Sequence, residues 1–166
     1  MRIGQGFDVH AFTTGNHVML GGVRVPHERA FLAHSDGDVL LHAITDALLG
    51  AAGLGDIGRH FPDTDERWKD ADSRELLRDV VAQLADRGFT CVSLDATVIA
   101  ERPRLGPFVD AIVTCLAADI GLDAGRINVK ATTSERLGFC GREEGIAAMA
   151  SVLLHEPDDT SSNTPT

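Results

Sequence analysis

Aromatic residues and cysteines are scarce in this sequence. Its 166 residues contain no tyrosine, one tryptophan and seven phenylalanines, so we expect a core built mostly from aliphatic side chains and alanine. The three cysteines, Cys91, Cys115 and Cys140, form no CxxC pair and are odd in number. This usage argues against a disulfide framework and favours a reducing compartment, in which all three would be structural thiols.

Long apolar runs are also missing. The longest nearly uninterrupted runs, residues 47–55 and 146–154, are much shorter than the roughly 20 residues that a membrane-spanning helix needs. The opening segment MRIGQGFD has no apolar run that could act as a signal peptide. We therefore expect a cytoplasmic protein with no membrane partner.

The sequence has fewer basic than acidic residues. The 15 lysines and arginines are outnumbered by 25 aspartates and glutamates, which gives a formal net charge of −10. A protein that binds a phosphate backbone usually presents a net basic face, so this balance argues against a nucleic-acid partner. The length suits a single domain, which we place at residues 1–156. Residues 157–166 carry no large apolar side chain, and we predict a disordered tail there.

Residue spacing in the first part of the chain predicts two strands and a helix. Residues 2–12 and 18–25 are predicted as strands that form a hairpin, the second strand running around a Gly-Gly pair. The clearest helical spacing follows Ser35 or Asp36, either of which could cap the helix. The helix is predicted to end around residues 53–58, and the stretch after it, which includes residues 61–65, is predicted as a loop.

The rest of the chain continues the alternation of helices and strands. A helix is predicted from residue 72 or 73 to residue 88, a strand over 89–100, a helix over 108–120 and a strand over 127–133. Residues 146–154 suit either a helix or an antiparallel strand, since periodicity alone does not decide between them.

This element order predicts an α+β fold. A single mixed β-sheet with helices packed on one face satisfies the pattern. The other face of so small a sheet is a candidate for cover by a partner subunit.

Asp8, His10 and His42 form a candidate metal group. Asp8 and His10 are two residues apart in a predicted strand, so both side chains point to the same face with Cα atoms about 6.6 Å apart. His42 lies in the clearest helix, and one carboxylate with two imidazoles leaves a fourth zinc position for substrate. The Asp-x-His pair alone is more often part of an exposed strand edge.

The sequence His34-Ser35-Asp36-Gly37-Asp38 places polar groups just before the same helix. Unsatisfied N–H groups at a helix N-terminus attract anions, phosphates in particular. Asp46 follows His42 by four residues, one helical turn, and could support that histidine. Taken separately, Asp36, Asp38 and Asp46 are more simply explained as ordinary capping and surface carboxylates.

A third polar cluster follows a predicted strand. Residues 130–135 offer a cation, hydroxyl groups and the carboxylate of Glu135. This combination suits a phosphate with a hard divalent ion, and it equally suits a Thr-rich loop that closes onto a helix cap. The nearby Arg142 adds a cation that could be a solvated surface side chain.

Five stretches of the chain resemble a known enzyme family. They are IGQGFDVHAF, LAHSDGDVLLHAITDALLGAAGLGDIG, FPDTD, DSRELL and NVKATTSERLGFCGREEGIA, and together they resemble 2-C-methyl-D-erythritol 2,4-cyclodiphosphate synthases of the non-mevalonate isoprenoid pathway. The resemblance runs in order, nearly without gaps, from Met1 to about Leu154. The HSDGD motif followed by His42, with FPDTD and KATTSE downstream, is its most specific part.

The resemblance implies a fold, an assembly and a reaction. The fold would be a β-α-β sandwich related to ferredoxin-like folds, with residues 146–154 as a strand. Three copies would form a homotrimer with active sites between subunits. The enzyme would be a phosphorus–oxygen lyase: the 2-phosphate of 4-diphosphocytidyl-2-C-methyl-D-erythritol 2-phosphate attacks the β-phosphate of the same molecule, which releases CMP and closes a cyclic diphosphate.

The resemblance also implies roles for individual residues. Asp8, His10 and His42 would hold zinc, and Glu135 would hold a second divalent cation, Mg²⁺ or Mn²⁺. His34 and Thr133 would support the transition state. The residues implied in substrate binding are Asp8, Val9, His10, His34, Ser35, Asp56, Ile57, Gly58, Phe61, Pro62, Asp63, Thr64, Asp65, Ala100, Glu101, Arg102, Pro103, Arg104, Leu105, Gly106, Ala131, Thr132, Thr133, Ser134, Glu135, Phe139 and Arg142.

Two other functions use the same residues. A metal-dependent phosphohydrolase would employ water as the nucleophile and release an open-chain product. A non-catalytic trimer would bind a prenyl diphosphate in its axial cavity, and its binding would survive the loss of His42. The presence of two candidate metal sites favours an enzyme over a protein that only binds.

Overall fold

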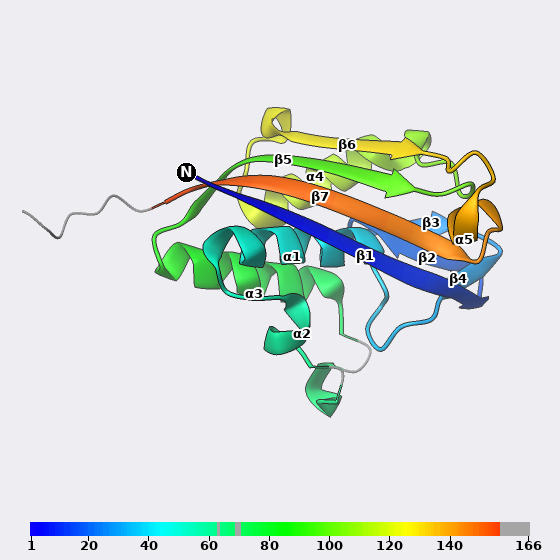
Figure 1. Ribbon diagram of the computed structural model, residues 1–166, viewed down its shortest axis with the longest axis horizontal. Coiled ribbons are helices and arrows are strands. Elements are labelled where there is room, and N and C mark those ends of the chain that lie inside the picture. Colours follow the sequence, from blue (N-terminus) through cyan, green and yellow to red (C-terminus); the bar gives the residue numbers. More distant parts are fainter. Residues whose placement is uncertain (63, 69–70, 157–166) are drawn as a thin grey trace, which may run out of the picture.

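The computed structural model describes residues 1–62, 64–68 and 71–156 (Figure 1). The predicted disordered tail, residues 157–166, lies outside the described residues. Five strands form a mixed sheet in the order β4-β1-β7-β5-β6, in which β5 and β6 are parallel and the other neighbours are antiparallel. In chain order these strands are β1 (Arg2–Thr14), β4 (Arg29–Phe31), β5 (Thr90–Ile99), β6 (Ile127–Thr132) and β7 (Gly145–His155).

The main helices pack on one side of this sheet, as the sequence predicted (Figure 1). Helix α1 contacts β1 and β7, α4 contacts β6, and α3 contacts both α1 and α4. Every helix in residues 1–62, 64–68 and 71–156 is too short or too polar to cross a membrane. The helices are α1 (Val39–Ala52), α2 (Ile57–His60), α3 (Ser73–Asp86), α4 (Val109–Ile120) and α5 (Gly138–Gly141), with 3₁₀ turns at Glu66–Trp68, Gly106–Phe108 and Ala124–Arg126.

Most predicted elements match the structure within one or two residues. Helix α3 begins where the sequence indicated, with Asp72 as its N-cap accepting the N–H of Arg74. Helices α1 and α4 end at Gly53 and Gly121, which adopt the left-handed conformation typical of helix C-caps. Strand β7 decides the ambiguous segment in favour of a strand, as the family resemblance implied.

The predicted pairing of residues 2–12 with residues 18–25 is wrong. The second segment forms a hairpin by itself, in which β2 (His17–Leu20) pairs with β3 (Val23–Pro26). The two residues between them, Gly21 and Gly22, have φ values of 61° and 77°, and a two-residue hairpin turn of this kind needs positive φ. Strand β1 pairs with β4 and β7 instead.

Asp38 caps α1, in place of the predicted caps Ser35 and Asp36. Its side chain is fully buried and accepts the N–H of Leu41 at 3.0 Å in the first turn of the helix. It also accepts the N–H groups of the two turn glycines of the β2–β3 hairpin, at 2.9 and 2.7 Å. One buried carboxylate therefore starts α1 and ties the hairpin to it.

Two glycines of β1 allow α1 to approach the strand backbone. A Cβ atom at Gly4 would lie 1.8 Å from the carbonyl oxygen of Ala47, and one at Gly6 would lie 1.9 Å from that of Ala43. The helix residues that face the strand, Ala43, Ala47 and Ala51, are also small and recur every four residues. Strand β1 runs through both glycines, as predicted, and they form its contact surface for α1.

We expect Gly6→Ala to lower the free energy of unfolding by about 3 kcal/mol or more, because the added methyl group meets backbone atoms that cannot move aside cheaply. The matched control is Gly50→Ala, where a Cβ would have its nearest neighbour 3.9 Å away. That control should be neutral or stabilising by up to about 1 kcal/mol, since glycine is a poor helix former. Denaturant unfolding at a fixed protein concentration measures both. A Gly6→Ala variant as stable as the wild type would contradict the close packing.

Candidate functional site

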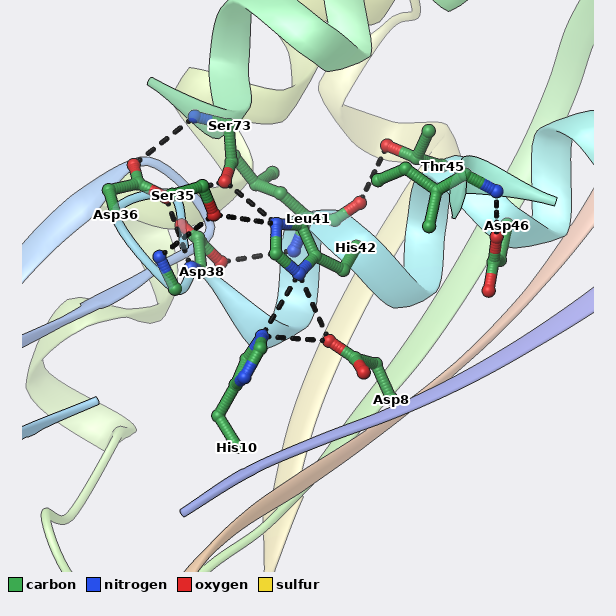
Figure 2. Close-up of polar contacts among 12 residues, drawn as sticks. Asp8, His10, Ser35, Asp36, Asp38, Leu41, His42, Thr45, Asp46 and Ser73 are labelled. Carbon is green, nitrogen blue, oxygen red and sulfur yellow. Dashed lines mark hydrogen bonds and ion pairs between the residues drawn. The ribbon is translucent and has the colours of Figure 1, made fainter. Parts of the chain in front are cut away.

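Three side chains from two elements converge at the start of α1. Asp8 and His10 come from the same face of β1, as their spacing predicted, and His42 comes from the first turn of α1 (Figure 2). The Asp8 Oδ2, His10 Nε2 and His42 Nδ1 atoms lie 3.0–3.1 Å from one another. The structure thus brings together the predicted metal group, which is defined here as Asp8, His10 and His42.

Within the metal group, Asp8 and His42 stabilise each other's charged forms. Burial alone would raise the pKa of Asp8, but the hydrogen bonds from His10 and His42 outweigh it and hold that pKa well below its usual range. For His42, burial lowers the pKa, while the hydrogen bond and negative charge of Asp8 raise it more. Asp8 is therefore ionised, as a metal ligand must be, and a cation at this position would displace any proton from the histidines.

The geometry of the metal group fits a small divalent cation. A tetrahedral zinc ion about 2.0–2.1 Å from each ligand separates the ligand atoms by about 3.3 Å, close to the spacing found here. Two imidazoles and a carboxylate belong to the usual zinc donor set. Three protein ligands leave one tetrahedral position for a further ligand, which is typical of catalytic rather than structural zinc sites.

The loop before α1 brings polar side chains to the other side of His42. The hydroxyl of Ser35 lies 3.3 Å from His42 Nε2, and His34 is exposed one residue earlier. Asp36 points to Ser73, whose hydroxyl and N–H both donate to its carboxylate (Figure 2). Ser73 also contacts His42, a role that the sequence did not reveal, because its DSRELL motif marked it only as a helix start.

Asp46 does not support His42, contrary to the prediction from its spacing. Its Oδ1 atom accepts the N–H of Ile57 at 2.7 Å instead. Asp56, the residue before, caps α2 with its own side chain. Asp46 therefore fixes the start of α2, where Asp56, Ile57 and Gly58 were predicted to contact substrate, to the helix that carries His42.

The predicted substrate loop at residues 61–65 is only partly described, since Asp63 lies outside the described residues. Phe61 is buried and packs edge-to-face on Trp68, with ring centroids 4.9 Å apart. Asp65 forms an ion pair with Arg67 at 2.6 Å. The contact between Phe61 and Trp68 therefore joins the two ends of the segment that follows α2, and the ion pair lies within that segment.

A second candidate site lies where β5 and β6 end. A cavity of about 920 Å³ is lined by residues 100–105 and 131–133, so two segments that the family resemblance implied in substrate binding lie together. Gly106 is not among the described lining residues, and neither is any member of the metal group. The sequence did not identify the other residues that line this cavity, which are Phe12, Pro26, His27, Glu28, Arg29, Arg136, Gly141 and Glu143.

Glu101 joins the two predicted segments of this cavity. Its Oε1 atom accepts the N–H of Arg136 at 3.0 Å and both the N–H and the hydroxyl of Ser134, at 3.1 and 3.2 Å. The N–H of Arg136, helped by the groups of Ser134, holds the pKa of Glu101 below its usual range. The sequence predicted Glu101 only as a substrate contact, because its partners lie more than 30 residues away.

Thr133 and Glu135 share the turn that Glu101 holds. The hydroxyl of Thr133 donates to Glu135 Oε1 at 3.1 Å, and Glu135 has a φ of 54°, a strained conformation for a residue other than glycine. The Glu135 side chain is exposed, so its carboxylate is accessible to a cation. Lys130 is engaged elsewhere, because its ammonium group forms an ion pair with Asp95 of β5.

Phe139 and Arg142 lie in and directly after α5. Phe139 is 41% exposed, and the guanidinium of Arg142 pairs with Glu144 at 2.9 Å. Neither is among the described residues that line the cavity or form the metal group. Their contact with the substrate, which the family resemblance implied, stays a prediction.

Comparison with known proteins shows the family. The model of the YgbB family matches residues 1–155. The chain belongs to the YgbB family. Its relatives include the 2-C-methyl-D-erythritol 2,4-cyclodiphosphate synthases of Chromohalobacter salexigens and Thioalkalivibrio sulfidiphilus, each 62% identical over 154 residues. These alignments cover 93% of this chain and 95% and 96% of the two relatives.

Solved structures share the fold of this YgbB-family chain. The bifunctional IspDF from Campylobacter jejuni is 48% identical with a TM-score of 0.89, over 92% of this chain and 42% of the longer one. A CDP-bound form of a 2C-methyl-D-erythritol-2,4-cyclodiphosphate synthase is 41% identical with a TM-score of 0.85, over 93% of this chain and 100% of the other. The resemblance inferred from the motifs is thereby confirmed.

We expect Glu101→Ala to loosen the turn that carries Thr133 and Glu135. The N–H groups of Ser134 and Arg136 should exchange with solvent faster, because both lose the charged acceptor that they share. Hydrogen exchange followed by NMR measures this directly. Glu28→Ala, at another carboxylate that lines the cavity, should leave both rates unchanged. Unchanged exchange rates in Glu101→Ala would show that the turn is stable without the Glu101 carboxylate.

Proposed function

We propose that this chain is a 2-C-methyl-D-erythritol 2,4-cyclodiphosphate synthase whose single catalytic domain is residues 1–156. It converts 4-diphosphocytidyl-2-C-methyl-D-erythritol 2-phosphate to 2-C-methyl-D-erythritol 2,4-cyclodiphosphate and CMP, in the non-mevalonate route to isoprenoid precursors. The observation that carries the proposal is the complete Asp8, His10 and His42 group in a chain 62% identical to such synthases over 93% of its length.

The proposed reaction joins two anionic groups of one substrate. An oxygen of the 2-phosphate bonds to the β-phosphorus, the bond from that phosphorus to the oxygen bridging to the α-phosphate breaks, and CMP leaves with the bonding electrons. Water and redox chemistry take no part. Because both reacting groups are negative, catalysis consists mainly of positioning and of neutralising charge.

The metal group would hold a zinc ion, and Glu135 would hold a second divalent ion, Mg²⁺ or Mn²⁺. When bound, these ions provide positive charge beside the phosphate oxygens and hold them in place. Thr133 supports this arrangement by orienting the Glu135 carboxylate, to which its hydroxyl donates at 3.1 Å.

The other predicted residues divide between the two ends of the substrate. Ser35, the start of α2 and residues 61–65 contact the methylerythritol and its phosphate, near the metal group. Residues 100–106 and 131–133 take the cytidine, which the cavity of about 920 Å³ accommodates. His34 and Thr133 stabilise the transition state. The CDP-bound form of a solved relative supports a cytidine diphosphate-linked substrate.

We also propose a homotrimer whose active sites lie between subunits. Ile3, Phe7, Val9 and Met149 are large apolar side chains on the sheet face opposite the helices, with exposed fractions of 79%, 56%, 43% and 39%. Phe7 lies opposite Met149 in the β1–β7 pair, and exposed apolar side chains of this kind are typical of a subunit interface. The cavity and the metal group are lined by different described residues, so a substrate that needs both can span two subunits.

A cytoplasmic location agrees with the cysteine chemistry. Cys91, Cys115 and Cys140 are all free thiols, and Cys140 is buried. Free thiols persist in a reducing compartment.

We expect purified protein to convert the proposed substrate to CMP and the cyclic diphosphate in equal amounts, with Mg²⁺ or Mn²⁺ present. His42→Ala should reduce turnover at least about 100-fold, because it removes a ligand of the metal group. Phosphorus NMR follows both products, and the metal content of each preparation is measured in parallel. Gly50→Ala, remote from both sites, is the control for general damage.

The same experiment separates the alternatives. CMP with an open-chain product would identify a phosphohydrolase that uses water. A folded, zinc-loaded protein without turnover, whose prenyl diphosphate binding survives in His42→Ala, would support the non-catalytic trimer.

We expect Phe7→Glu to dissociate the trimer, because a charge at the centre of the apolar sheet face cannot be buried without a partner. Light scattering after size exclusion should shift from three chains to one, and turnover should fall with it. Ala82→Glu, on the exposed surface of α3, should leave three chains together. A wild-type protein that is monomeric at assay concentration would reject the proposed assembly.

A further inference from the structure

His42 presents its two ring nitrogens to two different sets of partners. The Nδ1 atom faces Asp8 and His10 in the metal group, at 3.1 and 3.0 Å. The Nε2 atom faces the hydroxyl of Ser73 at 2.9 Å and that of Ser35 at 3.3 Å (Figure 2). A metal ligand at Nδ1 requires a free electron pair there, so the ring proton must sit on Nε2 and needs an acceptor.

Ser73 is arranged to be that acceptor. Its hydroxyl donates its own proton to the Oδ1 atom of Asp36, which leaves an oxygen electron pair available to the Nε2–H of His42. Asp36 is itself fixed, since its carboxylate accepts the N–H groups of Ser73 and Asp38 at 3.2 and 3.1 Å. Its own N–H donates to the carbonyl of Ala71 at 3.1 Å. Ser73 is only 1% exposed, so water does not compete for this contact.

We propose that Ser73 and Asp36 are positioning residues for the metal group, acting through His42. The ordered chain from the Asp36 carboxylate through the Ser73 hydroxyl to His42 Nε2 fixes the tautomer and the ring orientation, so that Nδ1 points at the ion. This inference rests on the proposed zinc site. Partners of this kind commonly set the orientation and basicity of metal-bound histidines, and their loss weakens metal binding about 10–100-fold.

Ser35 is the weaker candidate for the same role. Its hydroxyl is 0.4 Å farther from His42 Nε2 than that of Ser73, 3.3 against 2.9 Å, and already accepts the N–H of Gly37 at 3.2 Å. Ser73 also has a structural role at the start of α3, because it is the first residue of that helix and its N–H donates to Asp36. A test must therefore separate metal positioning from helix initiation.

The test measures zinc affinity of the full chain by competition with a chromophoric chelator. Ser73→Ala should weaken zinc binding about 10–100-fold, since alanine keeps the helix start and removes only the acceptor. Asp36→Asn, which weakens the negative end of the chain, should weaken it in the same direction by a smaller factor. The matched control is Asp72→Ala, which removes the N-cap of α3 without contacting His42. It should lower the thermal midpoint but leave zinc affinity unchanged.

NMR of the His42 ring provides a second readout, independent of turnover. The Nε2–H proton should be protected from exchange in the wild type and should exchange quickly in Ser73→Ala. Wild-type zinc affinity in both Ser73→Ala and Asp36→Asn would overturn the positioning role while leaving the zinc site intact. Equal losses in Ser73→Ala and Asp72→Ala would overturn it in favour of helix initiation. If the wild type and His10→Ala fail equally to bind zinc, the proposed zinc site itself is wrong.

Discussion

The close contact between α1 and β1 is the constraint on which the rest of the molecule depends. The metal group takes two ligands from the strand and one from the helix, so it exists only if the two backbones approach within the reach of short side chains. Gly4 and Gly6 permit that approach, because a Cβ at either position would overlap a carbonyl oxygen of α1. The buried carboxylate of Asp38 then fixes where the helix starts, four residues before His42.

Internal hydrogen bonds explain how an acidic protein can be built to bind an anionic substrate. The chain has a net charge of −10, yet the carboxylates nearest the metal group are engaged. Asp38 holds three N–H groups, Asp36 holds Ser73, and Asp46 holds the start of α2. The carboxylate directed at the centre of the group is Asp8, which a cation would neutralise. The positive charge that the substrate meets can therefore be supplied locally by metal ions, against the sign of the whole protein.

Much of this fold could be predicted from sequence because its elements obey local rules. The helix spacing, the Asp72 cap, the glycine stops and the i, i+2 placement of Asp8 and His10 all depend on neighbouring residues. The features that could not be predicted depend on contacts with residues far away in the sequence. The role of Gly4 and Gly6 becomes visible only when a helix is placed against them, and the alanines of β7 suit a helix as well as a strand. Asp46 has the correct spacing to support His42, but its carboxylate accepts the N–H of Ile57 at the start of α2 instead.

In the candidate site, too, features that depend on neighbouring residues could be predicted, and contacts between distant residues could not. Its ligands are recognisable by type and by family motif, whereas the side chains that orient them are not. Ser73 reaches His42 across 31 residues, and Glu101 reaches the turn of Glu135 across more than 30. The metal group and the cavity at the ends of β5 and β6 do not share a described residue. Within the part of the chain that the structure describes, the apolar sheet face around Phe7 is exposed. A partner subunit would account for both the exposed face and the separation of the cavity from the metal group. Assembly through this face would bury it and could bring the cavity of one chain to the metal group of the next.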